Sequence, residues 1–460
     1  MLRELNHQMT GMGKKDCFSE VILMEDYFNW VKSLTNPKDV HDKPEALEGI
    51  RVLDVSYGNF AGLFASSILA ELGAEVIKIE PPEGDIARKM TPFGILHKGT
   101  GLAYIIEGRN KYHITLNLTK EKGRDIYKKL VKKSDVVIES FGFGEAEKLG
   151  IGYPQLKEIN GKLIYVAIST YGQFGPEAKK GKSDYDLIDQ ARSTVMSVTG
   201  EAEFDPEVPE EYKVPLRMGN WMGWYTGGAW AAYAVLLALY WRNFSGVGQF
   251  IDVSPSEALL RHANYNIQYY HEAKKIVPRA GPYDPAVFAY TVVKAKDGHV
   301  FIAGYSDPNW KGLTTMINRP DLFEKFPTPR ERLIPENQIV MRNEIQNWAE
   351  SKTSDEILKL AMDHNLDESK VGTVVVGKIY KPKESSKLES WYERDILKKF
   401  EDPYFGELLI QGSSFGKMSE TPGRVKWCCR PVGADNTYVY TKLLGFDAKK
   451  MRELRDEGVI

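Results

Sequence analysis

Cysteine is scarce in this sequence. The 460 residues contain 3 cysteines, which are Cys17 and the neighbours Cys428 and Cys429. Their number and spacing provide neither a disulfide framework nor the ligand pairs of a metal site. We therefore predict no bound metal, and we expect the chain to work in a reducing compartment, the cytoplasm.

Long apolar segments and one-sided charge are also lacking. Residues 1–16 carry charges without the apolar core of a signal peptide, and the longest apolar run, Ala229–Trp241, is shorter than the roughly 18 residues of a membrane span. Lys and Arg number 61 against 63 Asp and Glu, and they form no basic cluster. We expect neither a membrane nor a nucleic acid as partner.

Short apolar strands alternate with helices from Ile50 onward. Residues 51–56, 61–74 and 75–80 have the pattern of a strand, a helix and a second strand. Such a unit requires a parallel, right-handed crossover. The same rhythm continues through the strand-like segments 113–118, 135–140 and 162–169, and it predicts a doubly wound parallel sheet. Farther along, residues 294–305 are typical of a β-hairpin turned at Asp297-Gly298.

A dinucleotide-binding loop is missing from the first of these units. Residues 56–62, SYGNFAG, lack the G-x-G-x-x-G pattern, so an NAD site is disfavoured even though Glu80 ends the second strand. Two later strands end in Ser140-Phe141-Gly142 and Thr170-Tyr171-Gly172. Small residues at the carboxyl ends of parallel strands favour ligand binding at that edge.

Several motifs follow one another through most of the chain. They are GIRVLDVS, LGAEVIKIEPPEGD, GRNKYHITLNL, DVVIESFGFGEAEKLGIGY, YGQFGP, YDLIDQA, SGVGQFIDVSPSEAL, TPGRVKW, RPVGADN and LLGFDAKKMRELRDEGVI. In this order and spacing they resemble the family III CoA-transferases, the group of the formyl-CoA and carnitine CoA-transferases. The resemblance covers roughly residues 48–460.

The resemblance implies an α/β fold with an unusual layout. A large domain with a doubly wound parallel sheet is built from both chain ends, a smaller α+β domain comes from the middle, and two subunits form interlocked rings. We expect an N-terminal extension at 1–47, the large CoA-binding domain at 48–264 and 376–460, and the small domain at 265–375. Residues 20–34 of the extension have helical periodicity, and we expect this helix to pack on the body or on a partner chain.

The family's chemistry depends on an Asp nucleophile, which takes up acyl and then CoA groups in covalent intermediates. It precedes an apolar helix that leads to a G-x-G-Q loop, here Gly246–Gln249. Counting back from this loop places Trp224 at the acid's position, and aligning on Gly219 places Asn220 there. Neither side chain is a nucleophile, and no Asp or Glu occurs between Glu211 and Asp252. We therefore predict no catalytic residue in this chain.

Three other activities are weighed against this interpretation. An autonomous CoA-transferase would need another acid, such as Asp186. An α-methylacyl-CoA racemase would need a His where Tyr185 stands. A CoA-binding protein without turnover has no positive feature in the sequence.

Some family members divide the work between two related subunits. The chain resembles the nucleophile-lacking subunit of such pairs, the nearest pattern being that of enzymes that move CoA from succinyl-CoA to benzylsuccinate. The implied partner is a homologous subunit that carries the Asp. Tyr185, Asp186, Trp221 and Tyr225 are expected at the rim of the substrate site; alternatively, the tryptophans only fill a subunit interface.

CoA contacts follow from the resemblance by position alone. No cofactor is expected to be tightly bound, because CoA and its thioesters are substrates. The residues expected to contact CoA lie in the loop after the first strand and near the ends of the next strands. They are Phe60, Ala61, Lys78, Arg88, Lys111, Ser140, Phe141 and Lys148.

Overall fold

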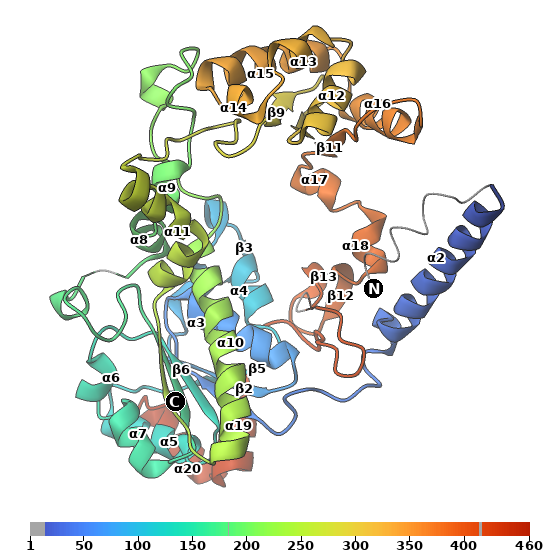
Figure 1. The fold of residues 1–460 in the computed structure, drawn as a ribbon. Coiled ribbons are helices and arrows are strands. Elements are labelled where there is room, and N and C mark those ends of the chain that lie inside the picture. The colour runs from blue at the N-terminus through green and yellow to red at the C-terminus, as the bar shows by residue number, and fades with distance from the viewer. Residues whose placement is uncertain (1–13, 183, 414–415) are drawn as a thin grey trace. The chain divides into compact units, whose positions relative to one another are not determined.

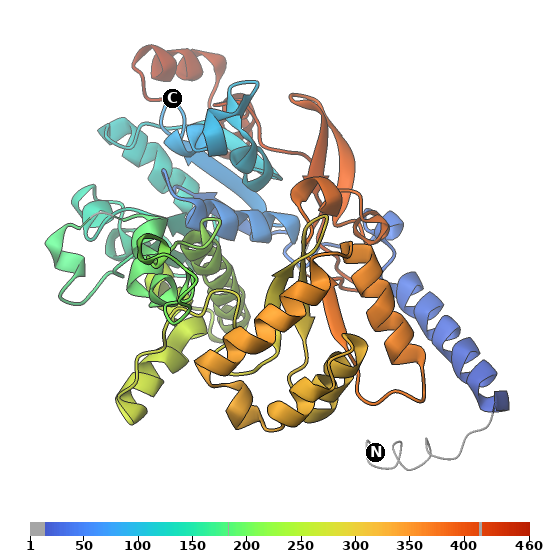
Figure 2. The same cartoon turned by 90° about the horizontal axis from the view of Figure 1, so that it is seen from above.

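The structure, a computed structural model, describes residues 14–182, 184–413 and 416–460, with only the backbone of residues 14–23 and 264. It divides into two compact units. Unit 1 holds the chain up to Ile168, Gly228–Asp252 and Leu388–Ile460, and unit 2 holds Ser169–Gly227 and Val253–Lys387. Figure 1 labels the elements, and both Figures 1 and 2 colour the chain from its N-terminus to its C-terminus.

Unit 1 is built on a six-stranded sheet in the order β5-β2-β1-β6-β7-β8. The register shows parallel pairing from β5 through β7. The order reverses at β1 and β6, because β2 and β5 extend the sheet on one side while β7 and β8 extend it on the other. The strands are β1 (Arg51–Asp54), β2 (Glu75–Glu80), β5 (Lys111–Thr115), β6 (Val136–Glu139), β7 (Ile164–Ile168) and β8 (Phe250–Val253).

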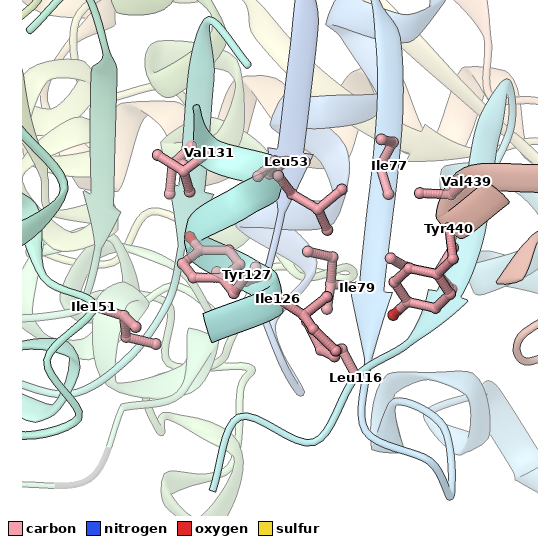
Figure 3. Close-up of a cluster of buried hydrophobic side chains, with 14 of the residues drawn as sticks. Leu53, Ile77, Ile79, Leu116, Ile126, Tyr127, Val131, Ile151, Val439 and Tyr440 are labelled. Carbon is pink, nitrogen blue, oxygen red and sulfur yellow. The ribbon is translucent and has the colours of Figure 1, made fainter. Parts of the chain in front are cut away.

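Helices cover both faces of this sheet. On one face, apolar side chains from the strands pack against α5 and the C-terminal helices (Figure 3). Burying each such side chain contributes about 1.5–3 kcal/mol. Because these side chains come from both ends of the chain, their packing joins the two ends in one layer. On the other face α3 packs against β1, β2 and β6. The helices are α3 (Phe60–Glu71), α4 (Leu102–Glu107), α5 (Glu121–Val131), α6 (Glu145–Lys148), α7 (Tyr153–Ile159), α19 (Asn436–Leu444) and α20 (Ala448–Asp456).

Further helices and short strands complete unit 1. Helix α2 (Lys14–Leu34) agrees with the predicted helix at 20–34 and begins earlier. Helix α10 (Met222–Ser245) enters unit 1 at Gly228, and the glycine loop after it leads into β8, as the pattern predicts. The short helix α18 (Glu389–Glu393) precedes the antiparallel pair β12 (Leu397–Asp402) and β13 (Gly406–Gln411). A small two-stranded piece, β3 (Leu96–His97) and β4 (Thr100–Gly101), follows β2.

Unit 2 has its own core around a three-stranded antiparallel sheet in the order β11-β10-β9. The predicted hairpin is confirmed, since β9 pairs with β10 in antiparallel register. The elements are α8 (Asp186–Arg192), α9 (Val195–Val198), α11 (Pro255–Ala273), β9 (Tyr290–Lys294), β10 (His299–Ala303), α12 (Asp307–Met316), α13 (Asp321–Lys325), α14 (Pro329–Arg332), α15 (Pro335–Ala349), α16 (Ser354–Leu366), β11 (Val375–Lys378) and α17 (Pro382–Ser385).

The two compact units group some segments differently from the domains expected at 48–264, 265–375 and 376–460, which stay a prediction. Residues 169–227 and 253–264 fall in unit 2, and the return to unit 1 comes at Leu388. The reason is that α8 packs against α11, so both join the segment that follows them. Of the helices in the described ranges, none combines the length and the apolar composition needed to cross a membrane.

Candidate active site

The carboxyl ends of β1 and β6 mark the point where the strand order of unit 1 reverses. Open α/β sheets bind ligands in the crevice at this point. The loop after β1 approaches the loop after β6 there, because the Tyr57 backbone N–H donates to Ser140 Oγ at 3.1 Å. Tyr57 is exposed while Ser140 and Phe141 are half-buried, so both loops present surface at the crevice.

The helix that follows β1 begins with a cap. Asn59 precedes α3, and its Oδ1 accepts from the Ala61 N–H at 2.7 Å, which is the preferred role of Asn at this position. Phe60 and Ala61 are buried in the first turn of α3. Contact of these two residues with CoA stays a prediction.

Lys78 and Lys111 lie in the core between β1, β2, β5 and α3. Neither side chain is exposed. Lys78 Nζ lies 3.3 Å from Asp54 Oδ1 and 3.2 Å from Asp85 Oδ2. Lys111 Nζ donates to the Leu63 carbonyl at 2.6 Å and lies 3.5 Å from Asp54 Oδ2. Buried ammonium groups require such partners, so their contacts favour a structural role over the predicted binding of phosphate.

This cluster shifts the pKa values of its members. Burial lowers the pKa of Lys111 to about 8, and the ammonium of Lys78 adds to the effect while Asp54 opposes it. Burial alone would raise the pKa of Asp54, but the two lysines and hydrogen bonds from Ser56 and Ser66 outweigh it and leave the pKa lowered. The charges therefore compensate one another inside unit 1.

The side chain of Arg88 is also held by contacts inside unit 1. Its Nε and Nη2 donate to the two carboxylate oxygens of Glu80 at 2.7 and 2.6 Å, and its guanidinium lies 4.6 Å from the ring centre of Tyr104. The pKa of Glu80 is lowered, because hydrogen bonds from Arg88 and His113 outweigh its burial. The expected CoA contact of Arg88 remains a prediction, and its bidentate pair with Glu80 favours a structural role.

A buried acid supports the loop after β6. Glu139 ends this strand, accepts a hydrogen bond from the Phe141 N–H, and receives one from Tyr165 Oη at 3.3 Å. Burial raises its pKa to about 8. The buried carboxyl of Glu139 thus holds the backbone of Phe141 in the loop after β6. Lys148, farther along in α6, is exposed and pairs with Glu145 at 2.5 Å.

Within unit 2, the start of α10 is held by Asp186. The Trp224 N–H donates to Asp186 Oδ1 at 3.1 Å, and the N–H of Gly223 lies within its reach as well. Both N–H groups belong to the first turn of the helix, which has no partners of its own for them. Burial raises the pKa of Asp186, and these hydrogen bonds oppose the rise. Its carboxylate acts as a cap.

The segment before α10 is clamped by Gln190. Its Nε2 donates to Asp186 Oδ2 at 2.7 Å and to the Asn220 carbonyl at 3.1 Å, while its Oε1 accepts from the Met218 N–H at 2.8 Å. One buried amide thereby fixes two points of the 218–224 segment and ties them to Asp186. The structure thus brings Asp186, Asn220 and Trp224 together.

The two positions considered for the missing nucleophile differ in setting. Trp224 is the third residue of α10 and is 2% exposed, whereas Asn220 lies before the helix and is exposed. Trp221 and Tyr225 are half-buried beside them, and the rings of Trp221 and Trp224 lie 6.1 Å apart. Tyr185 is 60% exposed. Aromatic surface therefore occupies the place where the resemblance puts a carboxylate.

Two more acids lie near Asp186. Asp184 accepts from the Thr170 N–H at 2.8 Å, and Asp189 accepts from Ser256 Oγ at 2.9 Å. Burial raises the pKa of both, that of Asp189 to about 7. All three acids accept hydrogen bonds from other residues of unit 2.

Sequence reasoning missed Asn59, Glu139 and Gln190, which position the backbone of the candidate site. Gln190 had a signal, because Asp186 and Gln190 stand four residues apart and face the same side of a helix. Within the described ranges, no group of three or more His, Cys, Asp or Glu side chains is placed to hold a metal ion.

Comparison with known proteins finds relatives over most of the chain. The model of "CoA-transferase family III" matches residues 47–436. The alpha subunit of succinyl-CoA–L-malate CoA-transferase of Chloroflexus aurantiacus is 33% identical over 422 residues, 90% of this chain and 92% of that protein. The corresponding beta subunit is 28% identical, covering 90% of this chain and 98% of its own. The succinyl-CoA–D-citramalate CoA-transferase of the same species is 31% identical, covering 91% and 98%.

The fold has solved counterparts. The crystal structure of a CaiB/BaiF family protein from Brucella suis superposes with a TM-score of 0.73 at 25% identity, over 87% of this chain and 99% of that one. The mixed α/β fold with its large parallel sheet is therefore shared with these structures.

Proposed function

The chain belongs to CoA-transferase family III, and from this membership we propose that it is a subunit of a heteromeric CoA-transferase. The complex moves CoA from an acyl-CoA donor, succinyl-CoA, to a carboxylic acid. Relatives named for succinyl-CoA support the donor, and the relatives named as alpha and beta subunits of one transferase support the division into two subunits.

One observation carries the proposal. The segment Met218–Trp224 has the position of a nucleophile loop, yet no carboxylate occurs between Glu211 and Asp252. The amide of Asn220 has no anionic form near neutral pH, and the buried indole of Trp224 offers no nucleophile. The Asp is then supplied by a homologous partner subunit.

The chemistry at the partner's Asp proceeds through covalent intermediates. Its carboxylate attacks the thioester carbonyl of succinyl-CoA. CoA thiolate is expelled, and a mixed anhydride of the Asp and succinate forms. The thiolate then attacks the acyl carbon of the Asp, releasing succinate and forming an enzyme-bound CoA thioester. The acceptor carboxylate repeats the two steps in reverse, so that the acceptor leaves as its CoA thioester and the Asp is regenerated.

The acceptor is an arylsuccinate such as benzylsuccinate. The half-buried rings of Trp221 and Tyr225 support an aryl group, since aromatic side chains offer large apolar surface at low entropic cost. CoA contacts the accessible residues at the crevice of unit 1 rather than the buried lysines and Arg88. These residues are Tyr57, Ser140 and Phe141, and Lys148 adds an exposed positive charge.

Asp186 is not favoured as the nucleophile of an autonomous enzyme. Its two oxygens accept from Trp224 and Gln190, and burial raises its pKa, so the carboxylate is neither free nor more ionised than usual. The racemase alternative lacks its His, because Tyr185 stands there.

A long apolar surface on α10 supports the subunit partner. Inside unit 1 its buried side carries Ala231, Ala232 and Val235. Its other side is also apolar and remains exposed. A helix that is apolar all round is normally covered on every side, so we place the partner subunit here, in the interlocked arrangement expected for the family. The exposed side carries Trp230, Tyr233, Leu237, Tyr240, Trp241 and Phe244.

The test is to trap the intermediates. The chain is purified alone and with the homologue that keeps the Asp, and each is incubated with succinyl-CoA and borohydride or hydroxylamine before mass spectrometry. We expect an adduct on the partner and none on this chain. The control replaces the partner's Asp by Asn, which abolishes the adduct. An adduct on this chain alone contradicts the silent-subunit role, and no adduct on either subunit contradicts the proposed transferase.

A further inference from the structure

Helix α2 carries a stripe of apolar side chains that stays open to solvent. Met24, Tyr27, Phe28 and Val31 follow the spacing of one helix face, and the first three are 68%, 59% and 51% exposed. A stripe with this spacing normally faces a core or another helix. Figures 1 and 2 show α2 projecting from the rest of unit 1, joined to it at its C-terminal end.

The stripe forms one wall of a groove of about 870 Å³. The opposite wall comes from residues 390–395 and Lys417. The one ion pair across it within the described ranges joins Lys32 Nζ to Glu393 Oε1 at 2.7 Å. Both side chains are about half exposed, and such pairs contribute little to stability. Among the described residues of unit 1, none fills the groove, and this ion pair holds α2 only weakly.

The α2 wall of the groove lies outside the family match, whereas the opposite wall lies within it. The family match begins at residue 47, after α2 has ended. The groove also lies apart from the crevice at Tyr57 and Ser140, since none of those residues lines it. The groove is therefore a surface separate from that crevice.

Charge at the groove favours a helix of the same kind as α2. Glu25 and Lys32 flank the apolar stripe seven residues apart, on the same side of the helix. When two copies of such a helix pack antiparallel about a two-fold axis near position 28, each Glu25 comes beside the other copy's Lys32. The opposite wall adds positive charge, because in the described ranges neither Arg394 nor Lys417 forms an ion pair.

We propose that the groove receives α2 of a second copy of this chain. The two α2 helices pack antiparallel, stripe against stripe, and join two copies through a surface separate from α10. A complex with a catalytic partner would then contain two copies of each subunit. A second copy is the favoured occupant because the order of Glu25, the apolar stripe and Lys32 along α2 is complementary to itself in an antiparallel pair.

The test measures the mass of the particle by sedimentation for the chain alone and for the complex with its partner. Phe28→Ser removes a central contact, and we expect it to weaken the association about 30-fold or more and to halve the mass of the wild-type particle. The matched control is Trp30→Ser on the same helix. Trp30 is 57% exposed but does not line the groove, so its variant keeps the wild-type mass. Circular dichroism checks that both variants fold.

A charge exchange tests the antiparallel order. Glu25→Lys brings two lysines together and lowers the affinity, and adding Lys32→Glu restores it. In a Cys17→Ser background, Phe28→Cys forms a disulfide-linked dimer of this chain under mild oxidation, whereas Trp30→Cys does not.

An unchanged mass in Phe28→Ser overturns the proposal, as does a loss of mass in Trp30→Ser of the same size. Association only in the presence of the partner subunit would show that the partner fills the groove, and this also overturns it. Because the chain is measured alone as well, the result does not depend on whether the transferase reaction occurs.

Discussion

Asp186 is the acid nearest to the place of the missing nucleophile, and its contacts argue for a structural role. Asp186→Ala removes the acceptor for the Trp224 N–H at the start of α10. Loss of such a cap costs about 0.5–2 kcal/mol, so we expect a lower free energy of unfolding in urea. The kcat of the complex should change by less than about tenfold, since removal of a true nucleophile costs several orders of magnitude.

Asp186→Asn is the matched variant, because its amide oxygen still accepts from Trp224. It should recover part of the lost stability. A fall in kcat of a thousandfold or more in both variants, with the partner subunit unchanged, would contradict the structural role and favour an autonomous enzyme.

Glu139 makes the stability of unit 1 depend on pH. Burial raises its pKa from 4.5 to about 8 in the folded chain. Between these values the folded chain binds a proton that the unfolded chain has released, so the contribution of Glu139 to stability is lost as the pH rises through this window. Glu139→Gln has no proton to lose, and urea unfolding at about pH 5 and pH 8.5 should show a smaller loss of stability than in the wild type.

The exposed acid Glu145 serves as a control for this experiment, since Glu145→Gln leaves the buried proton in place. Equal pH dependence in Glu139→Gln and in the wild type would show that Glu139 is ionised in the folded chain.

The lysines at positions 78 and 111 show why single side chains were hard to place from the sequence. Each stands in a strand of a sheet that is covered on both faces, so alternation along the strand does not separate a core position from a solvent position. Their role follows from the register, which sets Asp54 opposite Lys78 on the neighbouring strand. Pairing of distant strands is not contained in a local pattern.

Among the elements, α10 was the most predictable and its surroundings the least. Its helical character, the glycine loop after it and the strand β8 all follow from periodicity and turn residues. That α8 packs on α11 is a contact between segments far apart in sequence, and local patterns do not reveal it. The clamp by Gln190 depends on the same long-range contacts.

Gly228 shows how closely α10 approaches α3. A Cβ at this position would lie 2.5 Å from the Ala61 carbonyl oxygen. Gly228→Ala should therefore force the two helices apart and cost about 1–3 kcal/mol, measured as the free energy of unfolding in urea. Gly219 is the control, since a Cβ there meets nothing within 4 Å. An equal effect of Gly219→Ala would argue against this close contact.

For the whole molecule, the exposed side of α10 is the strongest sign of a partner subunit. Six large apolar side chains in unit 1 remain in contact with solvent on this helix, from 41% for Trp230 to 70% for Phe244. Monomeric proteins rarely expose so continuous an apolar surface. The sequence pattern shows that this helix is apolar on all sides and so favours cover all round, but a local pattern does not show which element or subunit provides that cover.

The final prediction concerns assembly through this surface. Tyr240→Lys combined with Phe244→Lys places two charges where the partner subunit would bury apolar area, so co-purification with the Asp-bearing homologue should be lost and transferase activity with it. Since both side chains are more than half exposed, the chain itself should keep its circular dichroism spectrum and its unfolding midpoint. Met362→Lys is the control, a 58% exposed residue on α16 whose variant should assemble normally. A fully assembled and active complex of the double variant would show that the partner subunit does not bind the exposed side of α10, and it would contradict the interlocked arrangement that we propose through this helix.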